Sequence, residues 1–185
     1  MVEEILKDTK AKMEKSLSST QAEFNKVRTG RASLSLLDTV RVNYYGNPVP
    51  LKQVANLAIP EPRTITIQPW DRSLIGEIER AILKADIGIT PNNNGVLIRL
   101  PVPTLTEERR KELVRLVHQL GEEGRVAVRN IRRDAIEKLR KVQKDRHISE
   151  DEEFKAGADV QKTTDAFIKK IDDAIQVKEK EILEV

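Results

Sequence analysis

The chain has 185 residues, of which 38% are hydrophobic and 34% are charged, and its 33 Lys and Arg residues nearly balance its 30 Asp and Glu residues. It contains no cysteine, which excludes disulfides, thiol catalysis and thiolate metal sites. The sequence has no secretory or transit peptide pattern and no run of the roughly 20 apolar residues that span a membrane, so we expect a cytoplasmic protein without membrane contact.

The distribution of proline divides the chain into three parts. All eight prolines lie between Pro48 and Pro103. Long helices exclude proline because it lacks an amide donor and clashes with the preceding turn. We therefore predict a helical domain of residues 1–30 and 105–185, with an inserted domain of residues 31–104. The breakpoints are Thr29-Gly30-Arg31, where glycine permits backbone angles that end a helix, and Pro101-Val102-Pro103, where alternate prolines force an extended path.

The N-terminal segment, residues 1–30, is predicted to contain one amphipathic helix. Its apolar side chains recur at spacings of three, four and seven residues, which line one side of a helix. These residues are Leu6, Met13, Leu17, Thr20, Phe24 and Val27.

The inserted part is predicted to be a small β/α/β domain. Residues 40–44 and 64–67 alternate as half-buried strands do, and residues 96–100 form a third candidate strand. Gly46-Asn47 marks a hairpin turn, and residues 73–85 carry their apolar side chains on one side of a short helix. The whole chain is therefore expected to be of the α+β class.

Two further helices are predicted after the insertion. The first begins near Thr104 or Thr106 and runs to about Arg146, which gives a rod of roughly 60 Å that needs neighbours along its length. The second begins with the capping pair Ser149 and Glu152. Its apolar stripe consists of Val160, Thr164, Phe167, Ile168, Ile171, Ile175 and Ile182. An elongated antiparallel three-helix bundle would bury the apolar stripes of all three helices, and a coiled-coil oligomer is the alternative.

A row of arginines marks the longest predicted helix. At about 100° per residue, Arg125, Arg132, Arg133 and Arg140 fall within about 60° of Arg129. The predicted core stripe lies about 200° away and consists of Leu113, Val117, Leu120, Ala127, Ile131, Ala135 and Val142. The arginines are therefore expected to face solvent. Guanidinium groups bind phosphate bidentately, so the row favours binding to folded RNA that is recognised by shape.

The same charges allow a simpler interpretation. Residues 107–146 carry thirteen Lys and Arg against eight Asp and Glu, a net charge of +5, whereas residues 147–185 carry six against eleven, a net charge of −5. Helices of opposite charge can pair with each other, and a charged helical face is often only solvated.

No catalytic constellation is present in the sequence. His118 and His147 are the only histidines, lack any acidic ligand spacing, and are expected at the surface or at a helix end. The glycines form no phosphate-binding loop. Trp70, beside a helix cap at Asp71, is expected in the core or at its rim. We predict a protein that is not an enzyme and uses no metal or cofactor.

The chain resembles the ribosome recycling factor family over essentially its whole length. The segments that carry the resemblance are Arg28–Ser33, Tyr44–Leu51, Leu105–Arg110, Val126–Ala135 and Ile148–Glu152. The resemblance implies an L-shaped molecule with a long three-helix bundle and a small β/α/β domain. Two residues depart from the family pattern: Leu34 replaces proline, and Ile136 replaces asparagine on the arginine face, where it would touch RNA or be exposed.

The resemblance also implies a function. After peptide release, a monomer of this kind would act with elongation factor G and GTP to separate the ribosomal subunits and release mRNA and deacylated tRNA, with GTP bound by the partner. Its bundle would bind large-subunit ribosomal RNA through Arg129, Arg132 and Arg133, with Arg28 and Arg31 as further contacts. The hinge residues would be Gly30, Arg31, Pro101, Val102, Pro103 and Thr104.

Two functions of other classes fit the same composition. A helical scaffold protein would use its apolar stripes to oligomerise, and sedimentation at increasing concentration would detect this. An RNA-processing enzyme would need an acid/base pair or metal-binding carboxylates, and turnover of labelled RNA with magnesium would detect it.

Overall fold

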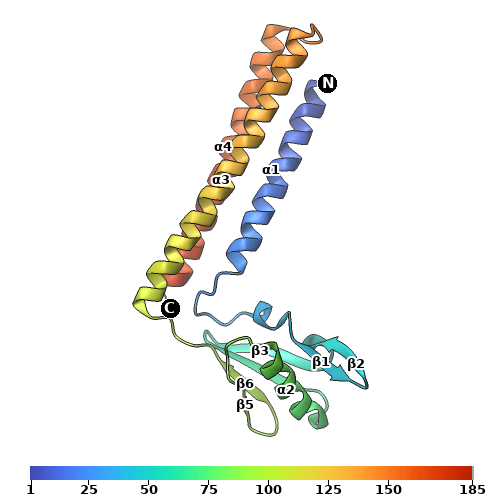
Figure 1. The fold of residues 1–185 in the computed structure, drawn as a ribbon, viewed down its shortest axis with the longest axis vertical. Coiled ribbons are helices and arrows are strands. Elements are labelled where there is room, and N and C mark those ends of the chain that lie inside the picture. The colour runs from blue at the N-terminus through green and yellow to red at the C-terminus, as the bar shows by residue number, and fades with distance from the viewer. Residues whose placement is uncertain (185) are drawn as a thin grey trace. The chain divides into compact units, whose positions relative to one another are not determined.

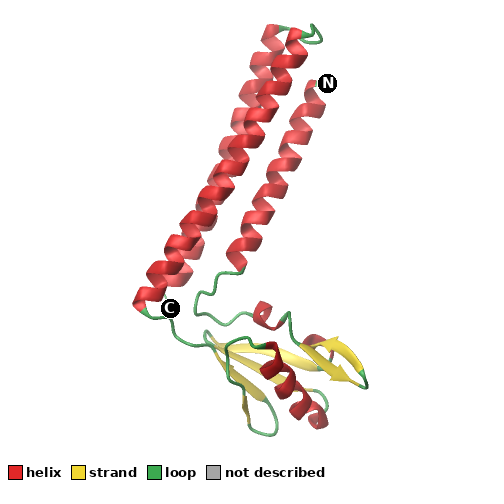
Figure 2. Cartoon of the chain, in the orientation of Figure 1, coloured by secondary structure: helices red, strands yellow, loops and turns green. Residues whose placement is uncertain are grey.

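The computed structural model of the protein describes residues 1–184. The chain folds into two compact units, one formed by residues 1–29 and 107–184 and the other by residues 30–106. The first unit is helical, and the second combines short strands with a helix (Figure 2). The predicted class, a helical bundle with a small α+β domain, is confirmed. No helix in residues 1–184 combines the length and the apolar character that crossing a membrane requires.

The first unit is a bundle of three helices, α1 (Val2–Asn25), α3 (Glu107–Lys144) and α4 (Glu150–Leu183). Figure 1 shows them side by side, with α3 running antiparallel to both α1 and α4. The 38 residues of α3 give a length of about 57 Å, because an α-helix rises about 1.5 Å per residue. Both α1 and α4 pack against α3, as the prediction of a bundle requires, and the 24 residues of α1 cover about 36 Å of its length.

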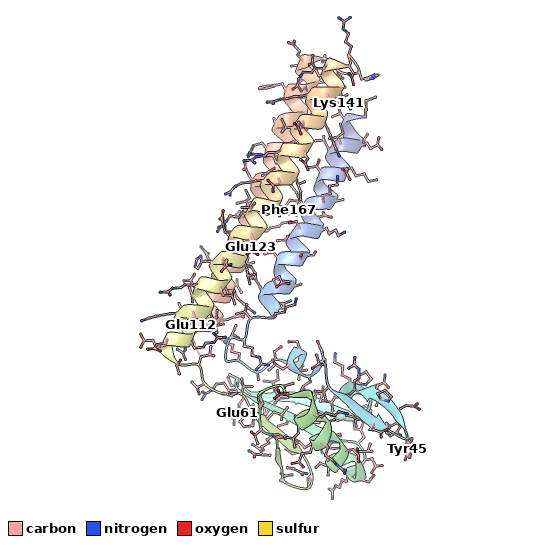
Figure 3. All side chains as sticks on the ribbon, viewed as in Figure 1. Tyr45, Glu61, Glu112, Glu123, Lys141 and Phe167 are labelled. Atoms are coloured by element: carbon pink, nitrogen blue, oxygen red, sulfur yellow. The ribbon has the colours of Figure 1, made fainter. Side chains whose placement is uncertain are left out.

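The bundle core consists of aliphatic side chains, with two phenylalanines. From α1 and α3 the fully or nearly buried apolar residues are Met13, Phe24, Leu113, Val117, Val128, Ala135 and Leu139, and from α4 they are Ala156, Val160, Phe167, Ile171, Ile175 and Ile182. Phe167 lies midway along the bundle (Figure 3). Burying each large side chain stabilises the bundle by about 1.5–3 kcal/mol, so these contacts hold the three helices together.

Two glycines allow the helices to approach closely. Gly121 and Gly124 of α3 are both buried. A Cβ atom at Gly121 would lie 2.7 Å from Cγ1 of Ile175, and one at Gly124 would lie 2.6 Å from Oγ1 of Thr20. A real Cβ atom does not tolerate neighbours at these distances. An added methyl group at either position would therefore force the facing side chain, Ile175 or Thr20, to shift.

Specific caps end α3 and begin α4. At the end of α3, the Arg146 amide donates to the Gln143 carbonyl at 2.9 Å and the His147 amide donates to the Val142 carbonyl at 3.1 Å, the pattern of a Schellman motif. Arg146 occupies the left-handed position at φ 59°. At the start of α4, the Ser149 hydroxyl accepts from the Glu152 amide at 3.1 Å, and the Glu152 carboxylate accepts from the Ser149 amide at 2.7 Å. The predicted capping pair is thus confirmed.

The second unit contains a hairpin, a four-stranded antiparallel sheet and a helix. The hairpin pairs β1 (Arg41–Tyr44) with β2 (Asn47–Pro50). The sheet has the order β3-β4-β6-β5, with β3 at Ala55–Glu61, β4 at Thr64–Pro69, β6 at Ile98–Pro101 and β5 at Asn92–Asn93. The helix is α2 (Ile75–Ala85), and short 3₁₀ turns lie at Leu34–Leu37, Leu51–Gln53 and Arg72–Leu74.

One apolar core joins these elements. Ile65 and Ile67 of β4, Ile98 and Leu100 of β6, and Ile78 and Ile82 of α2 are all buried. They belong to a single cluster that also includes Val42 of β1. The alternation of β4 and β6 places every second side chain in this cluster, as expected for strands with one buried face.

The strands at the margins are irregular. β3 lies at one edge of the sheet, contains Pro60, and changes register against β4 between Ala58 and Glu61. β2 carries Pro48 and Pro50. No strand was predicted at Ala55–Glu61, and the proline that β3 contains is tolerated because β3 is an edge strand.

Trp70 differs from its prediction. Its side chain is 68% exposed, so it belongs neither to the core nor to the rim. It follows β4 and precedes the cap in which the Asp71 carboxylate accepts from the Ser73 amide at 3.0 Å. The cap predicted at Asp71 is present, but it caps the 3₁₀ turn Arg72–Leu74 that precedes α2 and not α2 itself.

Candidate nucleic-acid interface

The arginine row of α3 contains two free cations. Arg133 and Arg140 are exposed, and neither forms a hydrogen bond or an ion pair with any of residues 1–184. Both lie within about 40° of Arg129 around the helix axis. They present unpaired guanidinium groups, whose five donors fit the oxygens of a phosphate or carboxylate.

Arg129 and Arg125 share a carboxylate. The Arg129 Nη1 lies 3.3 Å from Oε1 of Glu122, and the Arg125 Nη1 lies 2.8 Å from Oε2 of the same residue. Arg125 also reaches Asp172 of α4, with its Nη2 at 2.7 Å from Oδ1. Arg125 is only 23% exposed, whereas Arg129 is 42% exposed. Arg125 therefore ties α3 to α4, and Arg129 remains available at the surface.

Arg132 lies at the border between α3 and α4. Its side chain is half-buried, and its Nη1 donates to Oε1 of Gln161 in α4 at 3.2 Å. The Gln161 amide in turn donates to Asp165 at 2.8 Å. This contact uses one of the five donors of Arg132 and fixes the direction of the side chain.

The arginine row and the buried side of α3 are closer together than predicted. The buried residues of α3 are centred about 245° from Arg129 rather than about 200°, which leaves Arg125 and Arg132 only about 55–75° from the buried side. The reason is that Gly121, Gly124, Val128 and Leu139 form the contact with the neighbouring helices. The expectation that all the arginines face solvent is wrong for Arg125, half-right for Arg132, and correct for Arg133 and Arg140.

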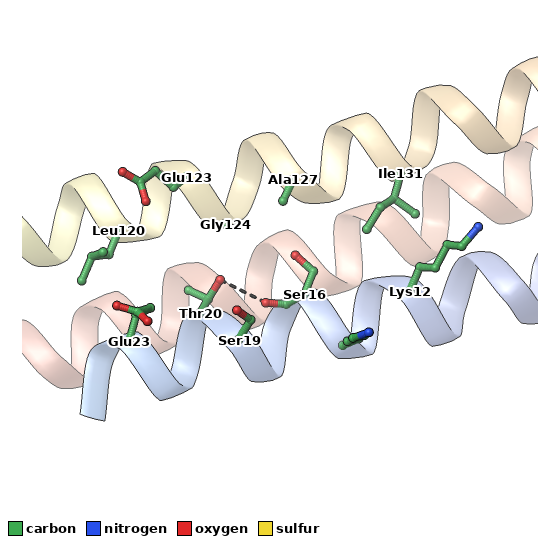
Figure 4. Close-up of a pocket in the computed structure, with 11 residues that line it drawn as sticks. Lys12, Ser16, Ser19, Thr20, Glu23, Leu120, Glu123, Gly124, Ala127 and Ile131 are labelled. Carbon is green, nitrogen blue, oxygen red and sulfur yellow. Dashed lines mark hydrogen bonds between the residues drawn. The ribbon is translucent and has the colours of Figure 1, made fainter. Parts of the chain in front are cut away.

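The residues that the sequence analysis placed in the core of α3 are partly open. Leu120, Ala127 and Ile131 are half-buried and line a groove of about 480 Å³ between α1 and α3 (Figure 4). Its rim carries Lys12 and Lys15 but also Glu23 and Glu123. The groove lies roughly opposite the arginine row around α3, and its charges are of both signs. It is therefore separate from the cationic surface.

Electrostatics hold the shared carboxylate ionised. The hydrogen bond from Arg125, with a smaller contribution from Arg129, lowers the pKa of Glu122 below its usual value. The hydrogen bond to Glu122 likewise raises the pKa of Arg125. Glu122 was missed in the sequence analysis, although its spacing of three and seven residues from the two arginines is that of same-face helical neighbours.

Ile136 does not project freely from the arginine face. It is half-buried and packs against the cluster of Ala135, Leu139, Ala156 and Val160. The expectation that it touches RNA or is exposed is corrected by this contact, which exists because α4 covers the side of α3 on which Ile136 lies.

The other predicted arginines lie outside α3. Arg28 follows α1, is exposed, and has no partner within residues 1–184. Arg31 is also exposed and belongs to the second unit.

The predicted hinge residues differ in how many hydrogen bonds they form with the second unit. Gly30 has φ 79°, a conformation that favours glycine. Pro101 pairs with Thr64 as the last residue of β6, and the Val102 amide donates to the Arg63 carbonyl at 2.8 Å. Thr104 accepts a hydrogen bond from the Arg63 side chain, and Pro103 lies between these two anchored residues.

The histidines lie at the surface, as predicted. His118 is 52% exposed, with its Nε2 at 3.2 Å from Oε2 of Glu179 in α4, and His147 is exposed beyond the end of α3. Within the described part of the chain, no three His, Asp or Glu side chains gather as a metal site would require.

Comparisons with known proteins identify the family. The family model described as ribosome recycling factor matches residues 20–183. The chain belongs to the ribosome recycling factor family. It is 55% identical over 185 residues to the ribosome-recycling factor of Trichlorobacter lovleyi and 53% identical over 184 residues to that of Desulfatibacillum aliphaticivorans, with 100% of each chain covered.

Solved structures of the family agree in fold. A solution structure of ribosome recycling factor matches with a TM-score of 0.79 and 42% identity, covering 100% of this chain and 98% of that one. A second match, with a TM-score of 0.66, 48% identity and 99% of each chain covered, is the T. thermophilus ribosome recycling factor in models with E. coli elongation factor G bound to the E. coli post-termination complex. The resemblance stated from the five sequence segments is thus confirmed.

Proposed function

We propose that this member of the ribosome recycling factor family binds the large ribosomal subunit after termination and splits the ribosome together with elongation factor G. GTP would be bound and hydrolysed by the elongation factor, and the splitting would release mRNA and deacylated tRNA in the cytoplasm. The solved relative that accompanies elongation factor G on a post-termination complex supports this choice of partners.

The observation that carries the proposal is the unpaired charge of α3. Arg133 and Arg140 are exposed without partners among residues 1–184, and Arg129 keeps 42% of its side chain exposed. Arg129, Arg133 and Arg140 share one face of a rigid helix and so offer adjacent sites for bidentate phosphate binding, whereas an isolated exposed arginine such as Arg99 does not. We infer that Arg129, Arg132 and Arg133 grip ribosomal RNA phosphates, and that Arg28 and Arg31 extend the contact.

The rigid mounting of these arginines supports a mechanical role. Gln161 directs Arg132, and Glu122 directs Arg129, so both guanidinium groups lose little freedom on binding. A rod of about 57 Å anchored in this way would resist a push from a motor protein. Rotation at the crossings near Gly30 and just beyond Thr104, which is tied to Arg63, would then let the second unit follow the elongation factor.

The phosphate contacts are tested by filter binding to large subunits across a salt series. Arg133→Ala and Arg132→Ala should each weaken binding by about 1.5–3 kcal/mol, the scale of charged hydrogen bonds, and should reduce the salt slope. Arg99→Ala is the matched control, because Arg99 is an exposed arginine of β6 without an ion pair in the described part of the chain. Equal affinities for the two α3 variants and the wild type would reject the proposed grip.

The complete function is tested with post-termination ribosomes, elongation factor G and GTP on a sucrose gradient. The wild-type chain should convert the ribosomes to subunits, and Arg133→Ala should slow this conversion. A Gly30→Pro variant should reduce splitting without reducing large-subunit affinity, because proline, with φ fixed near about −65°, cannot adopt the φ of 79° found at this crossing, whereas α3 is unchanged. Wild-type splitting by Gly30→Pro would remove the hinge from the mechanism.

A further inference from the structure

The tip of the β1–β2 hairpin combines exposure with backbone strain. Tyr45 is 83% exposed, the largest exposure among the exposed large hydrophobic residues of the described chain. Its φ is 49° and that of Gly46 is 85°, so both residues adopt the left-handed conformation of a type I′ turn. Asn, Asp or Gly normally occupies the first of these positions, because a bulky side chain is strained there. Tyrosine at this position therefore weakens the hairpin and leaves its ring in water.

A second ring holds Tyr45 in place. The rings of Tyr44 and Tyr45 meet edge to face, with centroids 4.5 Å apart and planes at 74°. Tyr44 is itself 39% exposed. Figure 3 shows Tyr45 at the end of the hairpin. An aromatic ring fixed in this way loses little freedom when a flat ligand stacks on its open face.

A cationic groove adjoins the same tip. It has a volume of about 400 Å³, lies between the hairpin and α2, and is lined by Arg41, Asn43, Gly46 and Pro48 of the hairpin region and by Lys84 of α2. Arg41 and Lys84 are its charged side chains, and none of its lining residues is acidic. Arg41 is oriented by hydrogen bonds from its Nη1 to the carbonyl oxygens of Asp38 and Val40, at 2.8 and 3.2 Å. Because both acceptors are neutral carbonyls, these bonds orient the guanidinium group without neutralising its charge.

We propose that the tip of the β1–β2 hairpin is a second RNA-binding element, in which Tyr45 stacks on an unpaired base while Arg41 and Lys84 hold the adjacent phosphate. An aromatic face beside cations is the combination that binds single-stranded nucleic acid, because every base has a face to stack and every linkage carries a negative charge. This element lies in residues 30–106 and is independent of the arginine row of α3.

The surroundings of Tyr45 favour a base over a protein side chain. Aromatic residues that anchor protein interfaces sit within a patch that excludes water. Here the residues next to the tyrosine pair in the hairpin are Asn43, Gly46 and Asn47, which provide no such patch. Stacking needs only the ring face. An acidic peptide is the competing ligand, and the test includes it.

The test uses the full chain and a fluorescently labelled single-stranded oligoadenylate, with affinity measured by anisotropy. Tyr45→Asn should weaken binding by about five-fold or more, the lower limit for losing one stacked base. Tyr45→Phe should keep most of the affinity because it retains the ring. Lys84→Ala should weaken binding and reduce its salt dependence by about 0.7 of a unit in the logarithmic slope.

Thermal unfolding separates binding from folding. Asparagine is favoured in the left-handed conformation, so Tyr45→Asn should unfold at the same temperature as the wild type or higher. Oligoadenylate binding by Arg133→Ala is measured separately, because it shows how much of the affinity comes from the arginine row of α3. Unchanged oligoadenylate affinity in Tyr45→Asn and Lys84→Ala would overturn the inference, whatever the effect of Arg133→Ala. Stronger binding of oligoglutamate than of oligoadenylate to the wild type would also overturn it.

Discussion

Alanine at position 124 tests the close approach of α1 and α3. Gly124 lies opposite Thr20 in the bundle (Figure 4), and a Cβ there would stand 2.6 Å from the Thr20 hydroxyl, 3.1 Å from its methyl group and 3.4 Å from Cδ1 of Ile171. The Thr20 hydroxyl donates to the Ser16 carbonyl at 3.1 Å, so it cannot move without losing that bond. Gly124→Ala therefore sets a gain in helix propensity against a steric clash.

The relative sizes of these energies decide whether Gly124→Ala stabilises or destabilises the bundle. Alanine stabilises a helix interior by about 1 kcal/mol relative to glycine. Overpacking a core costs about 1–3 kcal/mol, and losing the Thr20 hydrogen bond costs about 0.5–1.5 kcal/mol more. Gly124→Ala should therefore lower the free energy of unfolding by about 0.5–3.5 kcal/mol, and by about 2 kcal/mol at the middle of each range. In a Thr20→Ala background both clashing atoms are absent, and the same substitution should be neutral or should stabilise by up to about 1 kcal/mol.

Urea unfolding followed by far-UV circular dichroism measures this cycle. The coupling between positions 20 and 124 should be about 1–3 kcal/mol, as for residues in direct contact. Gly157→Ala is the matched control, because Gly157 also lies inside a helix but its added Cβ would stand 3.6 Å from Cδ1 of Ile136, an ordinary contact. It should not destabilise the bundle. Additive effects at positions 20 and 124, or stabilisation by Gly124→Ala alone, would refute the close-approach explanation.

Three other substitutions test the cap, the ion pairs and the core. Ser149→Ala should destabilise α4 by about 1 kcal/mol in thermal unfolding, because the first turn loses its cap. Above the usual carboxylate pKa, where Glu122 is ionised beside Arg125, Glu122→Gln should lower the free energy of unfolding. This difference from the wild type should vanish as the pH falls through the depressed pKa of Glu122. A difference that grows in acid would contradict the prediction. In urea unfolding, Ile171→Ala should cost about 2–5 kcal/mol and half-buried Ile168→Ala clearly less, so equal losses would mean that burial does not set the cost.

Periodicity predicted the α4 side of the bundle better than the α3 side. Val160, Phe167 and Ile171 repeat at helical spacing and are all buried. On α3 the same method selected Leu120 and Ile131, which line the open groove, because it counts hydrophobic side chains and ignores glycine. The actual contact uses Gly121 and Gly124, whose value lies in having no side chain, and this depends on the neighbouring helices.

The candidate site was predictable in its residue types and only partly in its geometry. Arg129 and Arg133 share a helix face by spacing alone. The contacts of Arg125 with Asp172 and of Arg132 with Gln161 join residues 47 and 29 positions apart, so they depend on how α4 is aligned with α3. The alignment of α4 with α3 cannot be predicted from the residues of either helix alone. It arises from the packing of the whole core.

The prolines of β2 and β3 have a consequence for the protein at high concentration. A strand with an open margin offers free amides and carbonyls to any other strand, including one from a second copy. Pro48, Pro50 and Pro60 interrupt that row of donors, and the register change near Pro60 bends β3 further from a flat template. Chains that collide in a crowded cell therefore meet an interrupted ladder at β2 and β3, which opposes aggregation by strand addition at these two strands.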